Sequence, residues 1–130
     1  MTREGGDHYY KKVALYQFGT GSPQYYSLFD AKTEYKIGQP IGQRVKRNHG
    51  GGYYVYRTVE QAARVPTTAS NFATKYSLTN WAILRMRCSG AYVRYEGGKL
   101  AFTHVEPIEE VSRCLLTITT ANTSTVITWP

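Results

Sequence analysis

The chain is poor in acidic residues and cysteines, and it has no long apolar segment. Aspartate and glutamate number 9 against 16 lysines and arginines, which gives a formal net charge of +7 over 130 residues. This surplus favours an acidic partner, and composition leaves nucleic acid, an anionic membrane and an acidic protein surface open. No apolar run reaches the ~20 residues of a membrane-spanning helix, and the polar N-terminal stretch lacks the apolar core of a signal peptide. We therefore expect an intracellular protein of the cytoplasm or the cytoskeleton.

Only two cysteines, Cys88 and Cys114, and three histidines are present. Their spacing matches no metal-ligand motif, so we predict no metal. Both cysteines lie in apolar, strand-like surroundings, where we expect reduced core thiols rather than a disulfide. The histidines, His8, His49 and His104, have no neighbouring partner motif that would make one of them a general base.

A group of three carboxylates, Glu106, Glu109 and Glu110, follows the last predicted hairpin, with Pro107 between the first two. A paired-carboxylate active site would need a second group from elsewhere in the chain. We interpret the group as a solvated turn. The sequence therefore predicts no catalytic residue and no cofactor.

Alternation of apolar and polar residues predicts strands along most of the chain. In chain order the predicted strands are Lys12 to Phe18, Tyr25 to Phe29, Glu34 to Ile37, Tyr53 to Tyr56, Trp81 to Cys88, Ala91 to Tyr95 and Lys99 to His104. Glu96-Gly97-Gly98 is a hairpin signal between the last two, and Pro107 to Arg113 is expected to continue the sheet. Within Trp81 to Cys88, Arg85 and Arg87 are predicted on the face opposite the buried one.

The remaining segments are predicted loops. Gln39 to Asn48 is expected to be a loop or a weak edge strand, and Pro66 to Thr79 the longest loop, with a second short helix left open there. Three glycines, Gly50 to Gly52, predict a mobile hairpin turn. Basic residues just before them leave anion binding by the glycine amides open.

A short helix is predicted directly after the aromatic strand. Thr58 and Gln61 have the spacing of a capping box, and Val59, Ala62 and Ala63 give the helix one apolar face. Pro66 ends it. The expected fold is a strand-rich α+β domain, with a mostly antiparallel, curved sheet and one or two short helices.

Three regions are expected: residues 1–8 as a flexible arm, 9–113 as one compact domain, and 114–130 as an uncharged C-terminal hairpin or attachment segment. Strand formers from Leu115 to Thr120 and from Thr125 to Trp129 flank Ala121-Asn122-Thr123. Left exposed, they would invite aggregation. Either the domain itself or a partner must therefore cover this segment.

Two family resemblances follow from short motifs. Gly51 to Tyr56, Thr58 and Ala62-Ala63 resemble the glycine-aromatic strand and helix of ADP-ribosyltransferase-like folds. That resemblance implies that Tyr53 or Tyr54 lines a nicotinamide pocket and that Glu109 or Glu110 is the late acid. The early His-Gly-Ser/Thr element is absent, since the first strand reads Val13-Ala14-Leu15-Tyr16-Gln17. The resemblance therefore implies a protein that has lost activity.

A longer resemblance covers roughly residues 12 to 111. Tyr25 to Leu28, Glu34 to Gly38, the run around Tyr53, Gly97 to Phe102 and Val105 to Val111 resemble an uncharacterised small strand-rich domain of protist and phage proteins. This resemblance implies a fold unit and no particular activity.

From these features we expect a non-catalytic structural or adaptor subunit that docks on an acidic partner within a large intracellular assembly. A ciliary or flagellar microtubule is the most concrete candidate, because tubulin is acidic. The alternatives are a nucleic-acid-binding subunit of ribosomal type, in which tyrosines stack on bases beside cations, and a degenerate ADP-ribosyltransferase-like protein. No membrane contact is expected. The predicted partner-binding residues are Lys46, Arg47, His49, Tyr53, Tyr56, Arg57, Arg64, Ile127 and Trp129.

Overall fold

The computed structural model describes residues 6–16, 20–28, 32–42, 51–65, 80–119 and 124–128, with the backbone alone for 116–119 and 124–128. The elements, in chain order, are β1 (Gly6–Tyr16), β2 (Gln24–Ser27), β3 (Glu34–Tyr35), β4 (Ile41–Gly42), β5 (Tyr53–Val55), α1 (Val59–Ala63), β6 (Trp81–Arg94), the 3-10 turn η1 (Glu96–Gly98), β7 (Leu100–Thr119) and β8 (Ser124–Thr128). The fold is mostly β, and within these residues α1 is the one α-helix. The expected strand-rich antiparallel sheet is confirmed.

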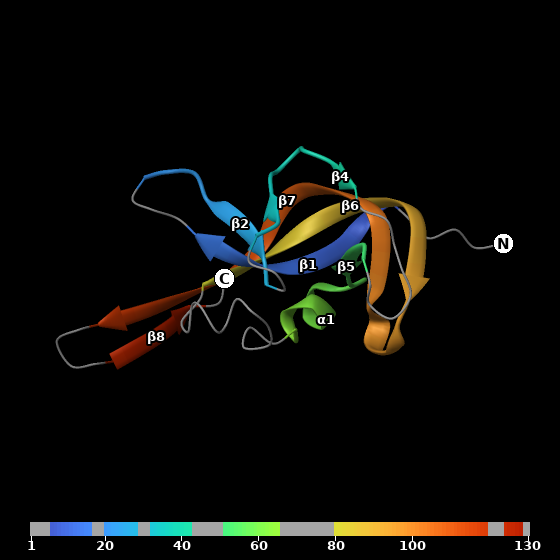
Figure 1. Cartoon of the computed structure of the whole chain (residues 1–130). Coiled ribbons are helices and arrows are strands. Elements are labelled where there is room, and N and C mark those ends of the chain that lie inside the picture. The colour runs from blue at the N-terminus through green and yellow to red at the C-terminus, as the bar shows by residue number, and fades with distance from the viewer. Residues whose placement is uncertain are drawn as a thin grey trace.

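The sheet is built around the two longest strands, β6 and β7. Its order is β3-β2-β1-β6-β7-β4, and β5 and β8 also pair with β7. Every pairing is antiparallel. Figure 1 shows β1, β6 and β7 running together through the middle of the molecule, with the β6–β7 hairpin turned down beside β5 and α1.

The sheet closes on itself at one end. Tyr56, directly after β5, exchanges two backbone hydrogen bonds with Tyr10 of β1, at 2.7 and 2.8 Å. Because β5 also pairs with β7, strands β1, β6, β7 and β5 form a hydrogen-bonded ring. This ring brings β5, the start of α1 and the β6–β7 hairpin together.

The core fills the inner face of this curved sheet. Its buried members are Tyr9, Val13, Leu15, Tyr25, Tyr35, Tyr53, Val55, Ala82, Leu84, Met86, Cys88, Leu100, Phe102 and Val105. The ring of Phe102 lies 5.1 Å from that of Tyr9 and stacks at 5.5 Å on that of Tyr92. Burial of alternate residues from Ala82 to Cys88 confirms the inward face predicted for this strand.

Helix α1 packs on the outer face of β1 and β6. It starts where the sequence predicts, because the backbone N–H of Gln61 donates to Thr58 Oγ1 at 3.0 Å. Its other end is held by Lys12, whose ammonium donates to the carbonyls of Ala63 and Val65 at 3.0 and 2.7 Å. That ammonium also lies 4.1 Å above the ring of Trp81. Burial lowers the pKa of Lys12 from its usual 10.5.

Several expected boundaries are wrong. Strand β1 begins at Gly6, so residues 6–8 belong to the sheet and not to a flexible arm. Strand β6 is continuous through the two strands expected between Trp81 and Tyr95, and β7 crosses the expected break between residues 113 and 114. Register shifts within the β6–β7 pairing reveal irregularities that let long strands bend without ending.

Two expectations about the edges of the sheet can also be compared with the structure. A loop or a weak edge strand is expected at Gln39 to Asn48, and Ile41–Gly42 within it forms the short edge strand β4. Strand β8 pairs with the end of β7, as expected of a final hairpin. Gly50 and the basic residues before it, at 43–50, lie outside the described residues, as do the arm at 1–5 and the loop at 66–79, whereas Gly51 and Gly52 form a bend before β5.

Candidate functional site

One outer region of β6 and β7 pairs cations with carboxylates. Arg85 lies 3.5 Å from Glu109 on β7 and 3.7 Å from Asp7 on β1, and Arg87 lies 3.9 Å from Glu106. The register sets Arg85 opposite Glu109 and Arg87 opposite Glu106. We call these five residues the charge ladder. The solvated turn expected at the glutamates is wrong, because they lie on a strand and face arginines.

Glu110 has a different partner set. It accepts a hydrogen bond from the Tyr25 hydroxyl at 2.9 Å and two from Arg113, at 2.6 and 2.8 Å. Burial, and then the bond to Glu110, raise the pKa of Tyr25 to about 12. The hydrogen bonds that Arg113 donates to Glu110 raise the pKa of Arg113. Glu110 therefore links β2 to β7, which is a structural task.

The residues implied by the ADP-ribosyltransferase resemblance lie apart. Tyr54 pairs with Ala101 at the start of β7. Glu109 follows eight positions further along the strand, which is about 26 Å of extended chain. The structure therefore does not bring the tyrosine segment and the late acid together.

At the hairpin end, lysines lie against tyrosines. The ammonium of Lys99 is 4.8 Å from the ring centre of Tyr54 and 5.2 Å from that of Tyr95, and the two rings meet edge-on at 6.1 Å. Lys11 donates to the Tyr54 carbonyl at 2.8 Å. Burial lowers the pKa of Lys99. We call Lys11, Tyr54, Tyr95 and Lys99 the tyrosine–lysine cluster.

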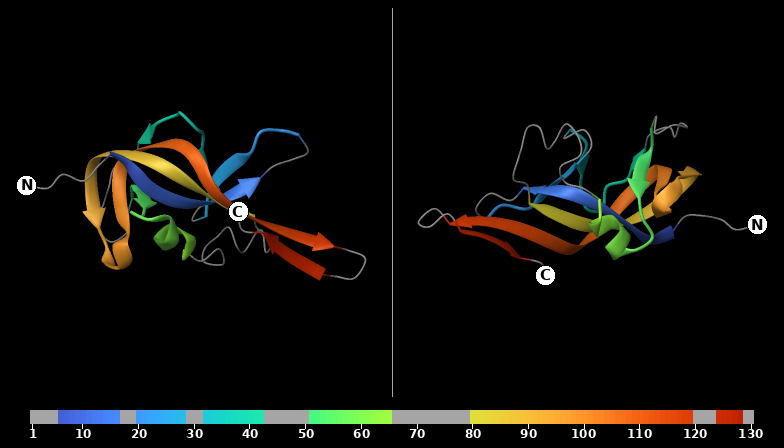
Figure 2. Two further views of the ribbon diagram at one scale, coloured as in Figure 1. Left: turned by 180° about the vertical axis from the view of Figure 1, so that it is seen from behind. Right: turned by 90° about the horizontal axis from the view of Figure 1, so that it is seen from below.

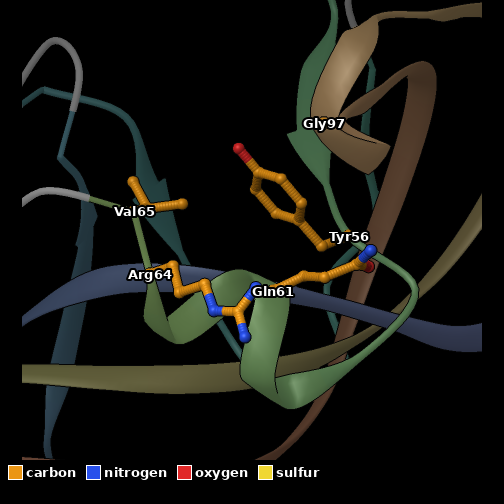
Figure 3. Close-up of a pocket in the computed structure, with 5 residues that line it drawn as sticks. All are labelled: Tyr56, Gln61, Arg64, Val65 and Gly97. Atoms are coloured by element: carbon orange, nitrogen blue, oxygen red, sulfur yellow. The ribbon is translucent and has the colours of Figure 1, made fainter.

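A pocket of about 240 Å³ lies between α1 and the β6–β7 hairpin. Its lining residues are Tyr56, Gln61, Arg64, Val65 and Gly97. Figure 3 shows the Tyr56 ring between Val65 and Gly97, with Gln61 and Arg64 extending from the helix below it. We call it the α1–hairpin pocket.

Gln61 fixes one wall of this pocket. A Cβ added to Gly98 would lie 2.6 Å from Gln61 Nε2, so the helix and the hairpin turn touch here. The second half of the expected capping box is therefore not made, because the amide lies against the hairpin rather than the cap. Gln61 Oε1 is buried and accepts no hydrogen bond from any described residue. A buried acceptor without a donor is costly, which makes this atom a candidate ligand contact.

The predicted partner-binding residues lie in different parts of the structure. Tyr53 is only 9% exposed and belongs to the core, so its assignment to a contact surface is wrong. Strand alternation turns it inward with Val55, and its ring meets Tyr35 at 6.3 Å. Tyr56 and Arg64 line the same pocket, and Arg57 is exposed beside Tyr56. Lys46, Arg47, His49 and Trp129 lie outside the described residues, and for Ile127 only the backbone is described.

Sequence reasoning missed Lys99, Tyr95 and Gly97 at this end of the molecule. A usable signal existed. The Glu-Gly-Gly turn places Tyr95 opposite Lys99, and the Tyr95 N–H donates to the Lys99 carbonyl at 2.8 Å. A cation directly across a tight turn from an aromatic ring is placed to contact it.

A second hollow, of about 550 Å³, lies at the β2–β3 edge. It is lined by Ser22, Pro23, Gln24, Tyr25, Glu34, Tyr35, Lys36 and Ile37. Ile37 is 45% exposed there. The lining mixes both charge signs without a focused arrangement, so we place the candidate site at the α1–hairpin pocket.

Comparison of the chain with protein-family models, curated proteins and solved structures found no match. In the described ranges, no group of three or more His, Cys, Asp or Glu side chains is arranged to hold a metal ion. Helix α1 is far too short to cross a bilayer, and no other helix of the described residues is long and apolar enough to do so.

Proposed function

We propose that this protein is a non-catalytic structural or adaptor subunit of a large intracellular assembly. It docks on an acidic partner through the end that carries the α1–hairpin pocket and the tyrosine–lysine cluster. One observation carries the proposal. Among the described residues, Arg64 and Lys99 form no ion pair, whereas the arginines of the charge ladder do. These two cations are therefore available for carboxylates from another molecule.

The surroundings of Cys88 and His104, a potential nucleophile and a potential base, support a non-catalytic role. Cys88 is 1% exposed, and burial raises the pKa of its thiol to about 12. Such a thiol is inert at neutral pH. His104 is exposed on the sheet, where its Nδ1 lies 2.9 Å from Thr103 Oγ1. That contact is not in either hollow.

Nucleic acid is the rival partner, and the aromatic rings favour it less. Tyr54 and Tyr95 pack on each other, and Tyr92 stacks on Phe102. Tyr16 and Tyr26 meet edge-on at 5.7 Å. Rings engaged in this way offer few free faces for base stacking.

The end of β7 and β8 supports attachment to a neighbour. Figure 2 shows this two-stranded ribbon projecting away from the rest of the described chain. From Cys114 to Pro130 the sequence has no charged residue. A two-stranded ribbon is marginal alone in water, so a neighbouring subunit is its expected support.

The test is binding of the whole chain to polyglutamate, to assembled microtubules and to single-stranded RNA over a range of salt concentrations. We expect tight polyglutamate binding that weakens as salt rises, and co-sedimentation with microtubules. The microtubule arm tests the most concrete partner. Stronger binding to RNA than to either acidic protein, or no binding to polyglutamate, would contradict the proposal.

Removing residues 116–130 tests the attachment role of the ribbon. We expect the shortened chain to keep its fold and its polyglutamate affinity, because the described core ends at Cys114 and Leu115. It should lose incorporation into the native assembly, measured by co-fractionation from cell extract. Normal incorporation of the shortened chain would exclude the ribbon as an attachment segment.

A further inference from the structure

We propose that the α1–hairpin pocket receives one glutamate or aspartate side chain, together with its backbone N–H, from an acidic peptide segment of the partner. This inference rests on the proposed function and names the chemistry of its central contact. Arg64 binds the carboxylate, Gln61 Oε1 accepts the backbone N–H, and the Tyr56 ring and Val65 cover the side-chain methylenes.

Arg64 supplies the charge. Its side chain is exposed at the pocket and has no ion pair among the described residues. A guanidinium presents two parallel N–H groups that match the two oxygens of a carboxylate. The carbonyls of its neighbours Ala63 and Val65 are held by Lys12, so the backbone that carries Arg64 is fixed before a ligand arrives.

Gln61 supplies the acceptor. Its Oε1 is buried in the lining without a donor among the described residues. A carboxylate alone has no N–H to donate to Gln61. Arg64 and Gln61 together therefore match a ligand that carries both an anionic group and a nearby hydrogen-bond donor. An acidic residue within a peptide has both, because its backbone N–H lies a few bonds from its carboxylate.

Gly97 leaves room for the peptide backbone. It has a φ of +79°, and a Cβ added to it would meet nothing within 4 Å. A chain can therefore approach the hairpin turn closely. Opposite it, the half-buried ring of Tyr56 and the Val65 side chain form an apolar wall.

The volume of the pocket favours a single side chain over a nucleotide as its ligand. At about 240 Å³, it falls below the ~300–1,000 Å³ range of small-molecule sites. One acidic side chain with its peptide group suits that volume better than a base, ribose and phosphate.

The experiment titrates the full chain with a capped hexaglutamate peptide, with capped hexaglutamine as the uncharged control and a uridine oligonucleotide as the RNA arm. Calorimetry gives affinities, and amide NMR shifts locate the contact. Of the three ligands, we expect only hexaglutamate to bind well. Its binding should shift the amide NMR signals of Gln61, Arg64 and Gly97.

Two variants and a matched control sharpen the result. Arg64→Gln should weaken hexaglutamate binding about tenfold or more, as expected for loss of a charge-assisted pair. Gln61→Met, which removes the acceptor at similar length, should weaken it about fivefold, as for one lost hydrogen bond. Arg87→Gln removes the same charge from the ladder and should leave affinity within about twofold.

Each outcome has one meaning. If hexaglutamate binds no better than hexaglutamine, the proposed function itself fails. If it binds well but Arg64→Gln and Arg87→Gln weaken it equally, the docking function stands and the pocket inference is overturned. Tighter binding of the uridine oligonucleotide, lost in Arg64→Gln, would make the pocket a nucleic-acid contact and would also overturn the inference. Dispersed amide spectra of the variants confirm that they remain folded.

Discussion

In the charge ladder, Arg85 and Arg87 face carboxylates at 3.5 to 3.9 Å. At the hairpin end of the same two strands, Lys99 lies over two tyrosine rings and Arg64 stands exposed at a pocket. Both regions carry basic side chains. In the charge ladder these side chains lie beside carboxylates, whereas at the hairpin end they lie beside aromatic rings or a pocket. The comparison shows that the 16 lysines and arginines are a poor guide to the docking surface, because some of them are paired with carboxylates within the molecule.

An irregularity in β6 separates the two regions. The register shifts between Ser89, opposite His104, and Tyr92, opposite Phe102. Gly90 lies inside the shift with a φ of +87°. A Cβ there would overlap Thr103 Oγ1, so a side chain does not fit without a shift of Thr103. The position therefore requires glycine for both its backbone angle and its close packing.

The largest expected effect follows from this position. Gly90→Ala should lower the free energy of unfolding by about 2–4 kcal/mol, from backbone strain and overpacking together. Gly97→Ala is the control, because its φ is also positive but its Cβ would meet nothing. It should cost only about 1–2 kcal/mol. Chemical denaturation measures both, and equal losses would show that strain alone matters at Gly90.

The second effect compares two glutamates of β7. Glu110→Ala removes an acceptor that is 19% exposed, together with the hydrogen bonds that Tyr25 and Arg113 donate to it. We expect a loss of about 2–3 kcal/mol in unfolding free energy. Glu106→Ala breaks only a long pair with the 56% exposed Arg87 and should cost under about 0.5 kcal/mol. A larger loss from Glu106→Ala would mean that the ladder stabilises the fold more than its geometry indicates.

A third, smaller effect tests how α1 holds the pocket. Thr58→Ala removes the N-cap bond to the Gln61 N–H and should cost about 1 kcal/mol. Because Gln61 and Arg64 follow the cap, hexaglutamate affinity should fall as well. Thr103→Ala removes a 3.3 Å bond to the Ser89 carbonyl on the exposed sheet and should leave affinity unchanged. Unchanged affinity in Thr58→Ala would separate the pocket from the cap.

The smallest effect depends on pH. The pKa of Tyr25 is raised from 10.0 to about 12 in the folded protein, so the folded state favours the neutral hydroxyl. The stabilisation is full below pH 10 and is lost as pH rises from 10 to 12. Tyr25→Phe should therefore be less stable than the wild type by about 1 kcal/mol at pH 9, and the gap should close toward pH 12. A gap that stays constant would assign the loss to packing instead of the hydrogen bond.

Local sequence chemistry predicted some parts of the site well. Thr58 caps α1 as expected, and Glu96-Gly97-Gly98 forms the turn between β6 and β7. Both depend on backbone geometry within a few residues. Tyr53 shows where this approach reached its limit. The run Tyr53-Tyr54-Val55-Tyr56 alternates, but aromatic residues on both faces concealed which face is inside, and the position of Val55 in the core settles it.

The sequence by itself determined that this protein is strand-rich, that a capped helix follows its tyrosine strand, and that positive charge exceeds negative. These properties follow from local backbone preferences and from composition. Only the tertiary structure decided which cations are neutralised and which remain available, because the partners of Arg85, Arg87 and Arg113 are set by strand register and by irregularities in the sheet. It also decided that Arg64 meets Gly97 at one pocket, because a hydrogen-bonded ring of four strands brings the helix to the hairpin.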